Sequence, residues 1–166
     1  RREGAEMTIL AAVEDINERQ KRVLTEKLLS HFGSLKGKTI GVWGLAFKPK
    51  TSDVREAPAQ TLIKDLAAAG ARVQAHDPKG IDGTRAALGE LQGVIYVNDQ
   101  YDAVNGADAL VLVTEWDIYK QPDFRRIKSL LASPVIVDGR NQYSPGEMER
   151  RGFTYYSIGR TAVRPE

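Results

Sequence analysis

The sequence predicts a doubly wound α/β fold with a mainly parallel sheet of about five or six strands, preceded by a long N-terminal helix. Short strand patterns alternate with helical patterns through residues 38–158, and strand–helix–strand units close as right-handed crossovers between parallel strands. The composition, 42% hydrophobic and 28% charged, is that of a globular domain and excludes wholesale disorder. We therefore expect a Rossmann-like domain with helices on both faces of the sheet.

The N-terminal segment, residues 6–32, has the pattern of one long helix. Gly33 follows it, where a helix commonly ends in a left-handed residue. Apolar side chains recur at steps of three and four residues: Ile9, Val13, Ile16, Val23, Leu24, Leu28 and Phe32. A stripe this long can exceed what one small domain covers, and the uncovered part would then contact a second chain or another domain. The alternative is a helix packed entirely on its own domain.

The later elements follow from apolar runs and turn residues. Pro58 opens one helical pattern and Gly70 closes it. Residues 109–114 are continuously apolar up to a threonine, which is typical of a strand covered on both faces. We expect strands at 38–47, 72–76, 94–97, 109–114, 134–137 and 153–158, helices at 58–69, 83–91, 122–131 and 145–151, and a helical turn at 101–105.

The charge and residue counts exclude several classes of function. The chain has 24 basic and 22 acidic side chains, and a net charge of +2 favours neither nucleic acid nor a membrane surface as partner. No apolar run approaches the roughly 20 residues that cross a bilayer. Cysteine is absent, which excludes a thiolate metal site or a cysteine nucleophile within these residues. His31 and His76 lie in different segments, so a histidine metal site or a catalytic triad has no support.

The start of the chain also carries information. Its first methionine is Met7, and no secretory signal precedes it. We expect a piece of a longer cytoplasmic protein, with no metal site of its own.

Charged side chains follow several of the predicted strands. In an open parallel sheet, ligands bind outside the carboxyl ends of the strands. Lys48, Arg55 and Arg140 would all lie at that edge, where a lysine and two arginines suit an anionic ligand such as a pyrophosphate. Other polar or aromatic candidates share the edge: Asp53, Glu56, His76, Asp77, Glu115, Trp116, Asp117, Asp138 and Asn141.

Each candidate also has a structural interpretation. Residues 41–44 (GVWG) lack the Gly-x-Gly-x-x-Gly fingerprint, so their glycines favour close strand–helix packing. Arg55 could pair with Asp53 or with Glu56. A His-Asp-Pro sequence at 76–78 is typical of a capped turn, and Glu115 and Trp116 could close the core at a strand end. The four aspartates at the edge match no metal-binding loop.

Five short motifs together resemble one family. Residues 44–49 (GLAFKP), 51–58 (TSDVREAP), 76–78 (HDP), 114–116 (TEW) and 138–141 (DGRN) occur in the order found in the C-terminal UDP-binding domain of the UDP-glucose/GDP-mannose dehydrogenase family. The lead helix, with NERQK at 17–21, looks like the end of the central helix that joins the two domains in that family. The resemblance covers essentially the whole chain. It divides the chain into part of the interdomain helix (1–34) and a UDP-sugar-binding α/β domain (35–166).

The resemblance implies an NAD-dependent parent enzyme. The Asp-Gly-Arg-Asn form favours the branch that oxidises the C6 alcohol of UDP-glucose to a carboxylate, over sister branches that use GDP-mannose or UDP-N-acetylmannosamine. The family uses two NAD⁺ and a cysteine that holds the aldehyde as a thiohemiacetal. That cysteine, its lysine partner and the N-terminal NAD-binding domain lie upstream in the family. The chain would then supply nucleotide-sugar binding and closure of the domain cleft, and would be inactive alone.

The resemblance also implies roles for single residues. Phe47, Lys48 and Arg140 match residues that contact the nucleotide sugar, and Arg55 matches one that points toward the NAD pyrophosphate. We add that Asp53 and Glu56 could hold Arg55 in place. His76 stands where tyrosine is common, and Ser52 where an acidic residue is frequent.

The expected partners are a UDP-sugar, the NAD-binding domain and a second copy of the chain, as a homodimer or a larger assembly formed through the central helix. An alternative remains open, in which the fragment serves assembly and binds no ligand on its own.

Overall fold

The computed structural model describes residues 3–165, with side chains from residue 10 onward. Six parallel strands form one sheet in the order β3-β2-β1-β4-β5-β6, which is the Rossmann strand order. The order in which strands are added reverses at β1: β2 and β3 lie on one side of it, and β4, β5 and β6 lie on the other. Folds of this type open a ligand-binding crevice between the two strands at that point, here β1 and β4. The strands are β1 (Thr39–Trp43), β2 (Arg72–His76), β3 (Val94–Tyr96), β4 (Ala109–Leu112), β5 (Val135–Asp138) and β6 (Thr154–Ser157).

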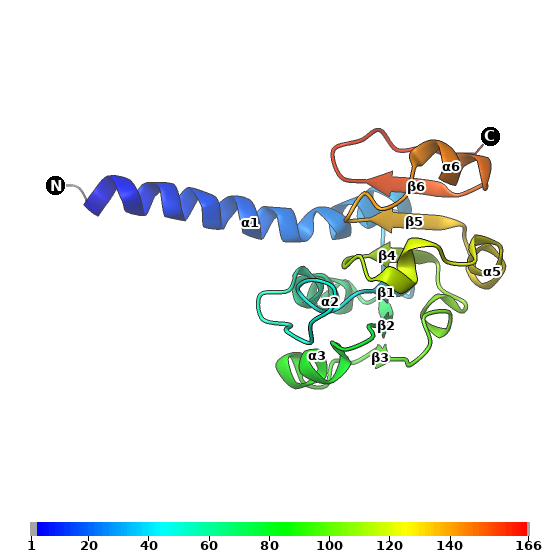
Figure 1. Ribbon diagram of the computed structural model, residues 1–166, viewed down its shortest axis with the longest axis horizontal. Coiled ribbons are helices and arrows are strands. Elements are labelled where there is room, and N and C mark those ends of the chain that lie inside the picture. Colours follow the sequence, from blue (N-terminus) through cyan, green and yellow to red (C-terminus); the bar gives the residue numbers. More distant parts are fainter. Residues whose placement is uncertain (1–2, 166) are drawn as a thin grey trace.

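Helices cover both faces of the sheet, as the alternating pattern predicts (Figure 1). Side chains of the strands alternate between two separate cores: Ile40 and Val42 face one core, and Trp43 faces the other. The first core lies under α1, α2 and α3, and the second under η1, α4, α5 and α6. The helices are α1 (Glu3–Phe32), α2 (Pro58–Ala68), α3 (Ile81–Leu88), η1 (Asp102–Val104), α4 (Asp117–Lys120), α5 (Phe124–Leu130) and α6 (Pro145–Arg150).

Only the C-terminal part of α1 belongs to the domain core. Leu24 and Leu28 are buried against β5 and α2, whereas the N-terminal part of the helix projects away from the body (Figure 1). There Leu10 is 63% exposed, Val13 48% and Ile16 53%. Full packing of the helix on its own domain is therefore excluded for this part. Ile9 lies outside the residues whose side chains are described.

The first strand ends at Trp43, before the expected Phe47. Gly44 follows with a φ of 93°, which is closed to most L-residues, and a Cβ there would lie 2.5 Å from the Thr114 backbone nitrogen. Gly41 likewise lies against η1, where a Cβ would come within 2.4 Å of the Ala103 oxygen. The close strand–helix packing expected of these glycines is found at Gly41, whereas Gly44 lies against Thr114 just after β4. The chain turns off the sheet at Gly44 and starts a long loop at the carboxyl edge.

Two smaller differences concern helices. The short helix α4 is absent from the sequence prediction, because four residues carry no helical periodicity. Helix α5 begins at Phe124 and not at Pro122, since the Asp123 carboxylate caps it by accepting from the backbone N–H groups of Arg125 and Arg126. Within the described part of the chain, no helix is both long enough and apolar enough to cross a membrane.

Candidate functional site

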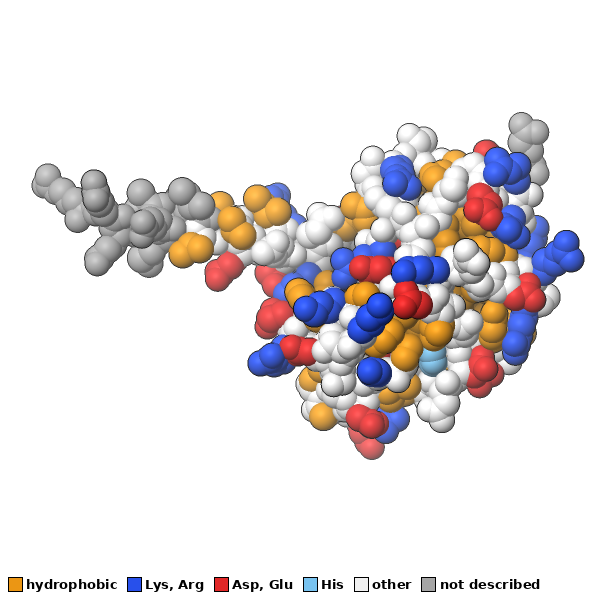
Figure 2. Space-filling view, viewed as in Figure 1, with side chains coloured by type: hydrophobic (Ala, Val, Ile, Leu, Met, Phe, Trp, Pro, Cys, Tyr) orange, Lys and Arg blue, Asp and Glu red, His pale blue; other side chains and the backbone are white. Residues whose placement is uncertain are grey.

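A groove of about 790 Å³ lies at the carboxyl edge of the sheet, between α1 and the strand ends. This volume falls in the range of small-molecule sites. Figure 2 shows basic and acidic side chains interleaved where α1 meets the domain body. One wall comes from α1, through Glu14, Asn17, Glu18, Gln20, Lys21 and Leu24, and the other from the segments after the strands, through Phe47, Glu56, Pro58, Val113, Gly139, Arg140 and Ile158.

Residues 44–57, which we name the rim loop, connect β1 to α2 and carry three of the predicted site residues. The loop starts on the buried carboxylate of Asp77, which accepts from the backbone N–H groups of Leu45 at 2.6 Å and Ala46 at 3.0 Å. The Thr114 hydroxyl donates to the Ala46 carbonyl at 2.6 Å. The start of the rim loop is thereby fixed to both neighbouring strands.

Asp77 receives three further hydrogen bonds. Its carboxylate accepts from the backbone N–H groups of Lys79 and Gly80 and from the indole N–H of Trp116 at 2.9 Å. The capped-turn interpretation of the His-Asp-Pro sequence is confirmed, and so is the core position of Trp116, which is 7% exposed. Asp77 is therefore a structural residue of the edge, since five protein donors occupy its carboxylate.

The neighbouring His76 is also part of the core. Its Nδ1 lies 2.7 Å from the Tyr119 hydroxyl oxygen, and that hydroxyl donates to the His76 carbonyl. The Tyr119 ring stacks on Trp43 at 4.7 Å between centroids. Burial lowers the pKa of His76 and raises the pKa of Tyr119. Both side chains are uncharged near neutral pH and take no part in the groove.

Asp138 plays the corresponding structural role at the end of β5. Its buried carboxylate accepts from the Tyr155 hydroxyl at 2.7 Å and from the backbone N–H groups of Arg140 and Tyr143. Asn141 has a φ of 54°, a conformation that asparagine tolerates, and its side-chain amide makes two hydrogen bonds with the Ile158 backbone. These bonds set the backbone on both sides of Arg140.

Arg140 lies in the groove against the rim loop. Its Nε donates to the Val113 carbonyl at 2.8 Å and lies 2.9 Å from the Glu115 carboxylate. Its Nη2 donates to the Phe47 carbonyl at 3.4 Å. The hydrogen bonds and the ion pair that Arg140 makes with the described residues use Nε and Nη2 and none uses Nη1, while the Arg140 side chain is 35% exposed. Glu115 thus pairs with the arginine at the end of β4, with its side chain 35% exposed and its Oε2 atom buried.

Phe47 lies beside Arg140, and Lys48 follows Phe47 in the rim loop, outside the lining of the groove. Phe47 lines the groove and is 49% exposed, an unusual degree for a large aromatic side chain. Its backbone N–H donates to the Asp53 carbonyl at 2.8 Å, which pairs the two arms of the rim loop. Lys48 is exposed, and its charge helps to lower the pKa of Asp53. The structure therefore brings Phe47, Lys48 and Arg140 to one edge.

Arg55 belongs to the same loop but not to the groove lining. Its guanidinium donates twice to Asp53, from Nε at 3.0 Å and from Nη2 at 2.8 Å, and its side chain is 88% exposed. Hydrogen bonds from Arg55 are the largest cause that lowers the pKa of Asp53 to about 2. Of the two suggested partners, Asp53 holds Arg55. Glu56 does not, because its carboxylate lies 3.1 Å from Lys21 of α1.

The sequence did not single out Lys21 or the other α1 residues of the groove as site residues. They occur in a helical pattern whose polar face is normally solvated, and no local signal marks them. Only the position of α1 over the sheet edge reveals their role. No cluster of three or more potential metal ligands occurs among the residues that the structure describes.

A second, smaller groove of about 330 Å³ lies at the opposite edge of the sheet. It is lined by residues near the amino ends of β1, β2 and β3, among them Thr39, Arg72 and Gly93. The Arg72 guanidinium is engaged there by the Thr39 hydroxyl at 3.2 Å. Ligands of open parallel sheets bind at the carboxyl edge, so the larger groove is the candidate site.

The strand order and the groove at the carboxyl edge define the class of the protein, a Rossmann-type α/β domain with a ligand-sized site at its topological switch point. The chain belongs to the UDP-glucose/GDP-mannose dehydrogenase family: residues 41–145 match the UDP binding domain of that family.

Similar proteins agree with this assignment. A UDP-glucose 6-dehydrogenase of Pseudomonas aeruginosa is 47% identical over 95% of the chain and 36% of its own length. A UDP-glucose dehydrogenase structure from Pyrobaculum islandicum superposes with a TM-score of 0.78 at 34% identity, over 94% of this chain and 33% of that one. An NDP-N-acetyl-D-galactosaminuronic acid dehydrogenase structure from Methanosarcina mazei gives 0.68 at 30% identity, over 84% and 28%. The chain thus spans about a third of the length of these relatives.

Proposed function

We propose that the chain is the nucleotide-sugar-binding part of an NAD-dependent UDP-glucose 6-dehydrogenase, and that its groove binds UDP-glucose. The observation that carries the proposal is the position of Arg140, which lies beside Phe47 in a ligand-sized groove at the carboxyl edge of the sheet. A guanidinium that is partly exposed suits a phosphate oxygen. The exposed Phe47 ring offers an apolar contact to the nucleotide, and Lys48 adds a second positive charge.

In the proposed parent enzyme, the C6 alcohol of UDP-glucose becomes the carboxylate of UDP-glucuronate, and NAD⁺ supplies the hydride acceptor when bound. The change from alcohol to carboxylate removes four electrons, which corresponds to two hydrides and two NAD⁺. The chain contains no cysteine, so the catalytic cysteine and its lysine partner belong to another part of the parent protein. This part binds and orients the diphosphate and is inactive alone.

Arg55 fits a contact with a cofactor held by the NAD-binding domain. It is 88% exposed and lies outside the lining of the groove, while Asp53 fixes its guanidinium through two hydrogen bonds. An arginine held on a loop at the edge of a domain can reach a pyrophosphate that another domain binds. We assign Arg55 to NAD, which is bound mainly by that other domain.

The remaining parts of the proposal concern organisation. Residues 1–34 would be the end of an interdomain helix and residues 35–166 the UDP-sugar domain. The exposed apolar side chains of Leu10, Val13 and Ile16 favour a further contact of α1, with the NAD-binding domain or with a second copy in a homodimer or larger assembly. The protein would act in the cytoplasm in polysaccharide biosynthesis. A sister substrate, such as a UDP-N-acetylhexosamine, is the second candidate, since the Methanosarcina mazei relative acts on an N-acetylated sugar nucleotide.

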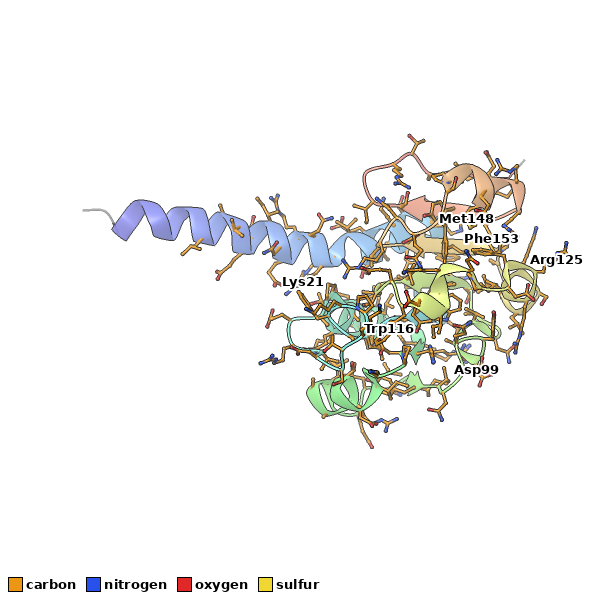
Figure 3. All side chains as sticks on the ribbon, in the orientation of Figure 1. Lys21, Asp99, Trp116, Arg125, Met148 and Phe153 are labelled. Carbon is orange, nitrogen blue, oxygen red and sulfur yellow. The ribbon has the colours of Figure 1, made fainter. Side chains whose placement is uncertain are left out.

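The test is a titration of the folded chain with UDP, followed by NMR. We expect weak binding, because half of the cleft is missing. Arg140→Ala should weaken binding about ten-fold, the value of one charge-assisted hydrogen bond. The control is Arg125→Ala, which removes an arginine at the far end of the domain (Figure 3). No response to millimolar UDP, or equal affinities of Arg140→Ala and Arg125→Ala, would contradict the proposal.

A further inference from the structure

The rim loop ends in a tight turn with an unusual residue. The Ala57 backbone N–H donates to the Val54 carbonyl at 3.1 Å, which closes a four-residue turn over residues 54–57. Glu56, the third residue of this turn, has a φ of 54°. A positive φ at that position is characteristic of a type II turn and normally selects glycine. A glutamate there is strained, and a favourable contact of its side chain would offset part of the strain.

That contact is made with α1. Lys21 Nζ lies 3.1 Å from Glu56 Oε2 and 2.7 Å from Glu18 Oε1. The Lys21 side chain is only 16% exposed, while that of Glu56 is 85% exposed. The hydrogen bonds that Lys21 donates to the two carboxylates, the one to Glu18 first, raise the pKa of Lys21 and keep it charged.

The pair connects the two walls of the groove. Lys21 and Glu18 lie on the α1 wall, and Glu56 lies on the wall formed by the rim loop. Figure 3 shows Lys21 on the side of α1 that faces the domain body. Arg55 directly precedes Glu56, and the Phe47–Asp53 backbone hydrogen bond joins the two arms of the loop. A displacement of Glu56 would therefore move the arm of the rim loop that carries Asp53 and Arg55, whereas hydrogen bonds with Asp77 and Thr114 fix the start of the loop.

We propose that Lys21 is a positioning residue: by holding Glu56 in its left-handed conformation, it fixes the rim loop in the arrangement that binds the diphosphate. The inference rests on the proposed function for the identity of the ligand. Lys21 acts through Glu56, and α1 thereby sets the width of the groove. A movement of α1 relative to the sheet would reach Glu56 and the adjacent Arg55 through this ion pair, in addition to the packing of α1 on α2.

The experiment measures two properties of the intact chain: hydrogen exchange of the Ala57 amide and the affinity for UDP. Lys21→Met and Glu56→Gln each remove the ion pair while keeping the length of the side chain. We expect each variant to speed Ala57 exchange and to weaken UDP binding by roughly three- to five-fold, the upper range for an ion pair with one exposed partner. The matched control is Asp15→Asn, which breaks the ion pair with Arg19 on the exposed surface of α1 and should change neither property.

A charge-swapped variant, Lys21→Glu with Glu56→Lys, separates positioning from direct contact when Glu18→Gln is added to remove the carboxylate that lies 2.7 Å from Lys21. It restores the ion pair with reversed polarity, so it should recover most of the Ala57 protection and of the UDP affinity. Unchanged Ala57 exchange in Lys21→Met would overturn the inference. Recovered exchange without recovered affinity would also overturn it, because Lys21 would then contact the ligand itself. If the wild-type chain fails to bind UDP, the proposed function fails, while the exchange data still decide whether Lys21 holds the turn.

Discussion

Replacing Asp77 by asparagine should destabilise the domain by about 3–5 kcal/mol, because the Asp77 carboxylate is the centre of the carboxyl edge. This side chain is 2% exposed and accepts five hydrogen bonds. Oδ2 receives the N–H groups of Leu45, Ala46 and Trp116, and Oδ1 receives those of Lys79 and Gly80. The substitution keeps the shape of the side chain, so the change measures hydrogen bonding and charge.

The expected loss of stability in Asp77→Asn follows from the number of hydrogen-bond donors that lose an acceptor. An asparagine that keeps its oxygen at the Oδ1 position places an NH₂ group against three N–H donors. Each buried donor left unpaired costs about 1–3 kcal/mol, and relaxation of the loop recovers part of the sum. The expected 3–5 kcal/mol is a large share of the roughly 5–15 kcal/mol that stabilises a domain.

The assay is urea unfolding followed by circular dichroism, with the free energy of unfolding extrapolated to water. Asp82→Asn is the control, since the Asp82 side chain is 97% exposed and should change stability by less than about 0.5 kcal/mol. A loss below about 1 kcal/mol in Asp77→Asn would refute the reasoning, because the carboxylate would then not hold the edge together.

Two further predictions concern α1 and the rim loop. Leu28→Ala should lower the free energy of unfolding by about 2–5 kcal/mol, since Leu28 is fully buried. Val13→Ala, on the exposed part of the same helix, should lower it by less than about 0.5 kcal/mol. Equal effects of the two substitutions in urea unfolding would contradict the packing of α1. The second prediction is a carbon NMR titration midpoint of about 2 for Asp53. The pKa of this group is lowered on folding, so its pairing with Arg55 is complete above the unfolded value of 3.8 and is lost as pH falls through about 2; a midpoint near 3.8 would show that the pair does not form.

Much of the fold follows from the sequence because its signals are local. Continuous apolar runs such as 109–114 mark buried strands, and Pro58 and Gly70 bracket α2 closely. The parallel direction of the strands follows from the crossover rule, and the structure confirms a Rossmann-type parallel sheet. The end of β1 was misplaced, because the conformation of Gly44 depends on its contact with Thr114, which is distant in the sequence.

The candidate site was predictable in part. Lys48 and Arg140 follow predicted strands, so the rule for carboxyl ends places them at one edge. Phe47 was predicted only from the family resemblance, and the structure shows its carbonyl in contact with Arg140. The role of Lys21 was not predictable, because it depends on how α1 crosses the edge of the sheet. The partner of Arg55 was left open between two nearby carboxylates, and the choice depends on the turn geometry of Glu56.

The N-terminal part of α1 has apolar side chains that the domain alone does not bury. The apolar stripe of α1 extends from Leu24 toward the N-terminus of the helix. The domain, however, covers the helix only from about Leu24 to its C-terminal end. Burial of a large apolar side chain stabilises by about 1.5–3 kcal/mol. A partner that covers Val13 and Ile16 would therefore gain several kcal/mol, which is consistent with a helix that joins two parts of an enzyme.

We propose that the diphosphate binds at the carboxyl edge, between α1 and the rim loop. Mapping of backbone amide shifts during a titration with UDP tests it most directly. We expect the largest backbone amide shifts to cluster at Phe47, Gly139 and Arg140, which line the larger groove. Shifts centred on Thr39 and Gly93, at the amino edge of the sheet, would contradict it.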